Sequence, residues 1–359
     1  MLGTSAGIPD LLYATGFDAP DPVAAVRWPD GRVLLLVGGM EFGRARRQSR
    51  GCEVGSAESL GLGAAARRTS SALLAEALAA RGVGTVCADG AFPFRAVVAL
   101  ERRGIRVHLV EQGPFGGARV VKSPEELRRI RRAQSAARAA ERAVGAAIRG
   151  AEVGRGGVLL HEGRVLTSER ARELVRGVLL ARGAMDFEGT IVAGGRQAAD
   201  PHEAGHGPLR TGEWIVCDIF PRDLRTGYWG DMTRTFLHGR PTREQRRLYD
   251  AVAAAQRLAL SRVRPGALGS DIHAAVVSFF RDAGWESGTR PDGRAYGFFH
   301  GTGHGVGLEI HEEPRLSPSG GALRPGMVVT VEPGLYYPEL GGVRIEDTVV
   351  VTPSGCEIL

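Results

Sequence analysis

Three acidic residues in the second half of this chain interrupt runs of apolar, mostly β-branched residues. Asp218 follows the run WIVC, Glu332 follows MVVTV, and Glu346 lies between VRI and TVVV. Runs of this kind predict buried strands, so each carboxylate is expected to be buried or nearly buried. An unpaired carboxylate in such a place is strongly unfavourable or becomes protonated. Each of these acids therefore requires a partner.

Asp231 and His304 complete a set of five candidate metal ligands, each in a segment predicted as a strand or strand edge. If the four carboxylates converge, their mutual repulsion raises their pKa values. Two divalent cations then supply about four positive charges that cancel the repulsion. The alternative interpretation is four unrelated acids at strand ends, each paired with one of the many arginines.

A glycine- and histidine-rich segment, HGTGHGVGLEIHEEP, contains His304 and, seven residues later, His311. Glycines at this density let the backbone approach a site closely. The segments VCDIFPRDLRTGYWGDMTRTF and VVTVEPGLYYPELGGVRIEDTVVV precede and follow it. Together the three motifs resemble the dinuclear metallopeptidases of the pita-bread fold (peptidase family M24), which include methionine aminopeptidases, Xaa-Pro aminopeptidases and prolidases. The resemblance covers residues 120–359, and the preceding 120 residues more loosely.

The resemblance implies a role for each of the five ligands. Asp218 chelates one metal, Asp231 and Glu346 bridge both, and His304 with Glu332 completes the second. The interval from Asp218 to Asp231 is two residues longer than is usual in the family. Residues 221–225 are the apparent insertion, in a hairpin turn, and a longer loop with both ligands retained is expected.

The resemblance also implies the chemistry: a hydroxide that bridges two divalent metals attacks the scissile carbonyl. Glu332 shuttles the proton to the leaving nitrogen. His202 and His311 match the two histidines that steady the intermediate or the end group of the substrate. Arg344 matches an arginine that orients the metal site or pairs with a substrate carboxylate.

Plainer interpretations exist for several of these residues. His202 follows a Gly/Ala-rich turn and is also compatible with an exposed loop, where His206 shows that a histidine alone is not diagnostic. Arg344 is compatible with being one more arginine in an arginine-rich chain. His300 has no firm counterpart in the family and is interpreted as a structural histidine.

The expected fold is an α/β N-terminal domain of the creatinase/prolidase type, residues 1–120, followed by an α+β pita-bread catalytic domain, residues 121–359, with a pseudo-two-fold internal repeat. Strand-like runs at 32–37, 84–87 and 106–111 and a helix at 70–80 support the α/β assignment. Capping boxes predict a helix from Ser123 to about Arg149 and another from Thr242 to about Val263. The N-terminal domain is expected to limit substrate length and to take part in dimerisation.

The preferred function is an Xaa-Pro dipeptidase (prolidase), because the N-terminal domain is short; an Xaa-Pro aminopeptidase is the alternative. A non-catalytic pita-bread binding protein and a creatinase-like amidinohydrolase are less favoured, since all five ligands are retained. The oxygen-rich donor set favours two manganese ions per subunit, with cobalt or zinc as alternatives. The expected partners are proline-containing dipeptides or short peptides and a second copy of the chain.

The net charge of +6 invites a nucleic-acid interpretation. Lys122 is the only lysine, and the arginines are scattered among acids, so neither nucleic acid nor a membrane is an expected partner. The four cysteines form no paired motif, and no signal-like or membrane-spanning segment is found, so a reducing cytoplasm is the expected location.

Overall fold

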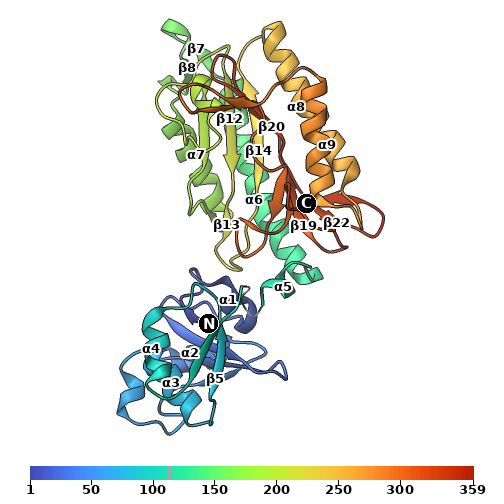
Figure 1. Cartoon of the computed structure of the whole chain (residues 1–359). Helices are drawn as coiled ribbons and strands as arrows, with labels where there is room; N and C mark the ends of the chain where they lie inside the picture. The colour runs from blue at the N-terminus through green and yellow to red at the C-terminus, as the bar shows by residue number, and fades with distance from the viewer. Residues whose placement is uncertain (112, 114) are drawn as a thin grey trace. The chain divides into compact units, whose positions relative to one another are not determined.

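The computed structural model describes residues 1–111, 113 and 115–359, which divide into two compact units, Met1–Arg119 and Val120–Leu359 (Figure 1). Each unit has its own hydrophobic core.

The first unit is an α/β domain. Its strands are β1 (Leu2–Gly3), β2 (Val23–Arg27), β3 (Val33–Leu36), β4 (Glu53–Gly55), β5 (Thr85–Ala88) and β6 (Arg106–Leu109), and its helices are α1 (Pro9–Thr15), α2 (Gly39–Gln48), η1 (Ala64–Arg67), α3 (Ser70–Ala79), α4 (Phe94–Glu101) and α5 (Gly116–Arg119). The first four strands form one sheet, antiparallel except for the parallel β3–β4 pair, and β5 pairs with β6 in parallel. The three predicted strands and the predicted helix are confirmed.

Strand β3 shows why this unit needs helices on both faces of its sheet. Leu34 and Leu36 pack into one cluster with residues of α3 and α4, whereas Val33 and Leu35 pack into another that contains Leu11 of α1. Successive strand residues point to opposite faces, so a fully apolar strand is buried only when both faces are covered.

The first half of the second unit packs two helices against a three-stranded antiparallel sheet. The helices are α6 (Pro124–Arg149) and α7 (Ser168–Ala181), and the sheet has the order β11 (Ile191–Gly194), β12 (Trp214–Ile219), β14 (Met232–Leu237). The predicted capping box at the start of α6 is confirmed, since Ser123 accepts a hydrogen bond from the Glu126 N–H and the Glu126 carboxylate accepts one from the Ser123 N–H. The shorter elements are β7 (Glu152–Val153), η2 (Arg155–Gly157), β8 (Leu159–His161), β9 (Arg164–Val165), β10 (Ala184–Met185), η3 (Gly195–Ala199) and β13 (Arg222–Asp223).

The second half repeats this plan with a larger sheet. Helices α8 (Arg243–Arg262) and α9 (Gly269–Asp282) pack against a sheet of order β18 (Glu312–Leu316), β17 (Gly303–Gly305), β19 (Val328–Val331), β22 (Asp347–Val351), β23 (Cys356–Ile358). Figure 1 shows β12 and β14 between α7 and the α8–α9 pair. The capping box at Thr242 is confirmed. Two further pairs are β15 (Gly288–Thr289) with β16 (Ala295–Tyr296), and β20 (Gly334–Tyr337) with β21 (Gly341–Arg344).

The two halves meet where β14 runs beside residues 344–346. The Glu346 N–H donates to the Thr233 carbonyl at 3.1 Å. The Thr235 hydroxyl accepts from the Arg344 N–H at 3.0 Å and donates to the Arg344 carbonyl at 2.8 Å. These contacts bring the strand that directly follows Asp231 in one half against the segment that contains Glu346 in the other.

The loop between β12 and β14 is more than a lengthened turn. Its strand β13 pairs with β10, with Ala184 opposite Asp223 and Met185 opposite Arg222. The loop is therefore attached through β13 to strand β10, which follows α7.

The sequence predicts unpaired cysteines and no membrane-spanning segment. Cys52, Cys87, Cys217 and Cys356 are free. Among the described residues, no helix combines the length and the apolar character needed to cross a membrane.

Candidate metal centre

The five candidate ligands lie in five different strands or directly beside them. Asp218 lies in β12 and Asp231 directly precedes β14, so the first half supplies two aspartates. His304 lies in β17, Glu332 directly follows β19, and Glu346 lies between β21 and β22. Because β17, β19 and β22 are neighbours in one sheet and β14 runs beside residues 344–346, these positions come together.

His304 is at the centre of the cluster. Its Nε2 atom lies 3.1 Å from Glu332 Oε1 and 3.6 Å from Asp231 Oδ2. Ligand atoms of Asp231, His304 and Glu346 all lie within 4.8 Å of one another, and all three residues are buried. His304 Nδ1 is 3.1 Å from the Gly305 carbonyl, so it carries a proton and leaves Nε2 facing the carboxylates. This tautomer and this group of oxygens suit a divalent cation.

Two carboxylate oxygens point to the same conclusion. Asp218 Oδ1 and Glu346 Oε1 are buried and have no hydrogen-bond partner among the described residues. The other oxygen of each carboxylate is held: Arg344 Nη2 donates to Asp218 Oδ2 at 2.6 Å, and the Thr233 hydroxyl donates to Glu346 Oε2 at 2.7 Å. Buried acceptors without donors are rare, and a metal ion satisfies them. The residues present therefore fit divalent cations.

The electrostatics of the cluster also require positive charge. Burial, followed by the charges of Glu346, Asp218 and Glu332, raises the pKa of Asp231 well above its ordinary value. Burial together with Glu332 and Asp218 raises the pKa of Glu346 in the same way. Glu332 behaves differently: burial acts to raise its pKa, but the hydrogen bond and the charge of His304 outweigh it and lower the pKa to about 2. Divalent ions would relieve the repulsion that raises the pKa values of Asp231 and Glu346.

Glycines on both sides of His304 let the strands approach. A Cβ at Gly303 would lie 1.9 Å from the Thr330 carbonyl oxygen, and a Cβ at Gly305 would lie 2.2 Å from the Glu313 carbonyl oxygen. Only glycine fits at either position. The glycine density of the sequence motif is thus explained by close backbone contact between β17 and its two neighbours, β18 and β19.

Several residues that support the ligands were not predicted from the sequence. Gln134 of α6 clamps the backbone of Asp231, because its amide oxygen accepts from the Asp231 N–H at 2.8 Å and its amide nitrogen donates to the Asp231 carbonyl at 2.9 Å. The Thr348 hydroxyl donates to the same carbonyl at 2.8 Å. The Thr330 hydroxyl donates to Glu332 Oε1 at 2.9 Å. Their sequence neighbourhoods are ordinary helix or strand patterns, so only the partners of these side chains distinguish them.

Arg344 is buried and fully engaged. Besides its bond to Asp218, its Nε donates to the Thr233 hydroxyl at 3.1 Å and its Nη1 donates to the Tyr336 hydroxyl at 3.0 Å. Arg344 thus connects the candidate ligand Asp218 to Thr233 and Tyr336. His300 Nε2 lies 2.9 Å from the Tyr336 hydroxyl, and Nδ1 lies 2.7 Å from the Gly301 carbonyl, so both ring nitrogens have partners.

The two histidines expected on the substrate side lie near the cluster and are exposed. The ring centroid of His311 is 4.4 Å from that of His304, and burial together with the charge of His304 lowers the pKa of His311 to about 4. His202 is close enough for its charge to act on His300 and His311. His206 is also exposed, and its backbone, not its ring, bonds to the Gln197 side chain.

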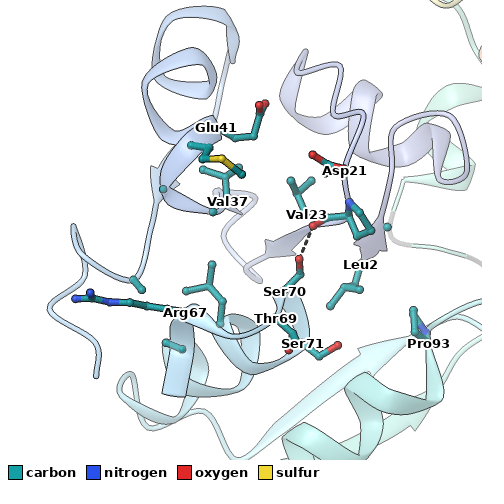
Figure 2. A pocket seen from close by; sticks show the side chains of 18 of the residues that line it. Leu2, Asp21, Val23, Val37, Glu41, Arg67, Thr69, Ser70, Ser71 and Pro93 are labelled. Atoms are coloured by element: carbon teal, nitrogen blue, oxygen red, sulfur yellow. Dashed lines mark hydrogen bonds between the residues drawn. The ribbon is translucent and has the colours of Figure 1, made fainter. Parts of the chain in front are cut away.

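The first unit has a cavity of about 570 Å³. Figure 2 shows side chains of both charges around it, among them Asp21, Glu41 and Arg67, and a hydrogen bond from the Ser70 hydroxyl to the Pro22 carbonyl. None of the five candidate ligands lines this cavity.

Comparison with known proteins places this geometry in context. The model of metallopeptidase family M24 matches residues 128–353. An Xaa-Pro dipeptidase of Pyrococcus furiosus is 36% identical over 250 residues, 67% of this chain and 63% of the relative, so the match spans less than two thirds of that protein. A putative dipeptidase of Bacillus subtilis, YkvY, is 30% identical over 98% of this chain and 90% of its own length. The solved prolidase of Pyrococcus furiosus superposes with a TM-score of 0.78 at 25% identity and covers 97% of this chain and 93% of its own.

Proposed function

We propose that this chain, which belongs to metallopeptidase family M24, is a metal-dependent Xaa-Pro dipeptidase that hydrolyses the peptide bond before proline. The observation that carries the proposal is the buried cluster around His304 Nε2, in which Asp218 and Glu346 each present an oxygen without a partner. The relatives named Xaa-Pro dipeptidase and prolidase support the choice of substrate.

We propose two divalent ions per subunit, with manganese preferred over cobalt or zinc because four of the five donors are carboxylates. Asp218 would hold one ion and His304 with Glu332 the other, and Asp231 and Glu346 would bridge them. When bound, such ions lower the pKa of water and polarise a carbonyl group.

The residues of the chain move protons and hold the substrate. Glu332, ionised at neutral pH, accepts the proton of the attacking water and passes it to the nitrogen of the leaving proline. The Thr330 hydroxyl fixes the position of Glu332 Oε1 during this transfer. His311 is neutral at pH 7 because its pKa is about 4, so its ring N–H donates a hydrogen bond to the substrate without adding charge. His202 is proposed to hold the other end of the substrate. Arg344 positions Asp218.

Residues 121–359 would carry catalysis, whereas residues 1–120 would limit substrate length and contribute to a homodimer. The α/β fold of the first unit supports a separate role for it. A reducing cytoplasm is the proposed location, which the four free cysteines support.

The decisive experiment uses metal-stripped protein titrated with manganese, and measures free proline released from Ala-Pro and Met-Pro. Release that depends on manganese and disappears in the Asp231→Asn/Glu346→Gln variant is expected. The tripeptide Ala-Pro-Ala is assayed in parallel, and cleavage of the tripeptide alone would replace the dipeptidase by an Xaa-Pro aminopeptidase. Folded protein that is inactive with manganese, cobalt and zinc would instead indicate a binding protein.

A further inference from the structure

The long loop between Asp218 and Asp231 is well ordered by its own contacts. The Asp223 carboxylate accepts hydrogen bonds from the N–H groups of Arg225 and Thr226, at 3.1 and 2.8 Å, and from the Thr226 hydroxyl at 2.8 Å. Arg132 of α6 forms an ion pair with the same carboxylate at 2.7 Å. Asp223 thus fixes the middle of the loop, and this restricts the positions that the last residues of the loop can take.

Trp229, near the end of this loop, reaches across to the other half of the unit. Its backbone N–H donates to the Gly307 carbonyl at 2.8 Å, and its indole Nε1–H donates to the Leu308 carbonyl at 3.1 Å. The side chain is only 6% exposed, so both bonds are shielded from water. One residue therefore fixes two consecutive carbonyl groups.

In the sequence, Gly307 and Leu308 lie midway between His304 and His311. Residues 306–311 join β17 to β18 without regular secondary structure. Gly307 and Leu308 lie three and four residues after His304, and four and three residues before His311. His304 lies in β17 and is held to the neighbouring strand β19, since its N–H donates to the Thr330 hydroxyl at 3.0 Å. His311 lies between the irregular segment and β18, whose first residue, Glu312, pairs with Gly305, so the position of His311 depends on this pairing and on how the irregular segment is held.

We propose that Trp229 is a positioning residue that sets the place of His311 relative to the metal ligands. This inference rests on the proposed function, in which His311 contacts the substrate. Trp229 acts on substrate binding and not on metal binding, because Asp231, two residues later, is held independently by Gln134. The longer loop therefore couples the aspartate half of the unit to the substrate-side histidine of the other half.

The chain offers a matched control for Trp229. Trp214 is 5% exposed, close to the 6% of Trp229, but its indole nitrogen has no hydrogen-bond partner in the described part of the chain. Trp214→Phe and Trp229→Phe thus make the same change at equal burial, and only the second removes a hydrogen bond. Trp229→His, which keeps a ring N–H donor, tests for recovery.

The experiment measures kcat and KM for Ala-Pro, the manganese affinity by electron paramagnetic resonance, and amide hydrogen exchange of residues 306–311. For Trp229→Phe we expect KM to rise about fivefold, as the loss of one buried hydrogen bond implies, while kcat and manganese affinity stay within about twofold. Exchange in residues 306–311 should accelerate. Trp214→Phe should match the wild type in its kinetic constants, manganese affinity and hydrogen exchange. The KM and the exchange rate of Trp229→His should lie between those of the wild type and those of Trp229→Phe.

Equal KM and equal exchange in the two phenylalanine variants would overturn the inference. A parallel loss of manganese affinity in Trp229→Phe would also overturn it, since Trp229 would then act on the metal ligands. If the wild type does not cleave Ala-Pro, the proposed function fails, whereas hydrogen exchange still decides whether Trp229 holds this segment. If Trp229→Phe does not fold, the same measurements on Trp229→His decide the question: a raised KM and faster exchange of residues 306–311 at unchanged manganese affinity support the role, whereas wild-type KM and exchange, or a changed manganese affinity, refute it.

Discussion

Removing the divalent ions should make the stability of this protein depend on pH in a direction set by two carboxyl groups. The pKa values of Asp231 and Glu346 are both raised well above their ordinary values in the ion-free centre. Over the range between the ordinary and the raised pKa, the folded chain binds more protons than the unfolded chain. The free energy of unfolding must therefore fall as pH rises through that range.

The magnitude follows from the number of protons involved. Each carboxyl that is protonated only in the folded chain changes the free energy of unfolding by about 1.4 kcal/mol per pH unit. Two such groups give a slope of up to about 2.8 kcal/mol per pH unit. Glu332 adds nothing above pH 5, because its lowered pKa of about 2 contributes stability that is lost only as pH falls from its ordinary value toward 2.

Histidines act in the opposite direction and must be subtracted. Burial lowers the pKa of His300 and of His311 to about 4, so between pH 4 and 6.5 the unfolded chain binds more protons at these positions, and stability rises with pH. The Asp231→Asn/Glu346→Gln variant keeps both histidines and removes both carboxyls. The difference in slope between wild type and variant therefore isolates the carboxyl contribution.

The assay is urea denaturation of chelator-treated wild type and variant at pH 5.5, 6.5, 7.5 and 8.5, with and without manganese. The wild type should lose stability relative to the variant as pH rises, and manganese should stabilise the wild type more at pH 7.5 than at pH 5.5, because it displaces protons that are held more weakly at high pH. Parallel curves for wild type and variant, or a manganese effect independent of pH, would show that the carboxyl groups do not hold protons in the folded chain and would refute the reasoning.

Three further substitutions test how the centre is held. Arg344→Met leaves the buried carboxylate of Asp218 without its cation, and urea denaturation should show a loss of about 3–5 kcal/mol. Gln134→Leu removes the acceptor of the Asp231 N–H, so a loss of about 1–3 kcal/mol is expected by the same method, together with weaker manganese binding in a calorimetric titration. Gly303→Ala places a Cβ 1.9 Å from a carbonyl oxygen of β19, so separation of the two strands should lower the melting temperature and abolish manganese binding.

The sequence identifies the candidate carboxylate ligands because each is an acidic residue in or beside a segment whose pattern predicts a buried strand. An acid such as Asp218 inside a β-branched run conflicts with burial unless another group compensates, and that conflict is visible without a structure. The capping boxes at Ser123 and Thr242 are equally local, since both partners lie three residues apart, and the helices begin where they predict. A single sequence thus shows two kinds of feature well: an acid placed in an apolar strand, and partners that lie only a few residues apart.

The supporting groups are invisible in the sequence because their partners are distant along the chain. Gln134 lies 97 residues from Asp231, and Thr233 lies 113 residues from Glu346. Nothing near Gln134 distinguishes it from any other polar residue in an amphipathic helix. The pairing of β13 with β10 escapes prediction for a related reason, since two-residue strands carry too little pattern to reveal a partner.

The distribution of the ligands has a consequence for folding. Asp218 and Asp231 come from the sheet that packs on α6 and α7, whereas His304, Glu332 and Glu346 come from the region that packs on α8 and α9. No single half presents a complete donor set, so an ion that needs ligands from both binds only after the halves have docked. Docking without an ion brings buried carboxylates together and is opposed by their repulsion, as the raised pKa values of Asp231 and Glu346 record. Metal binding is therefore thermodynamically linked to docking of the halves, and the ion stabilises the contact between β14 and residues 344–346 as well as the centre itself.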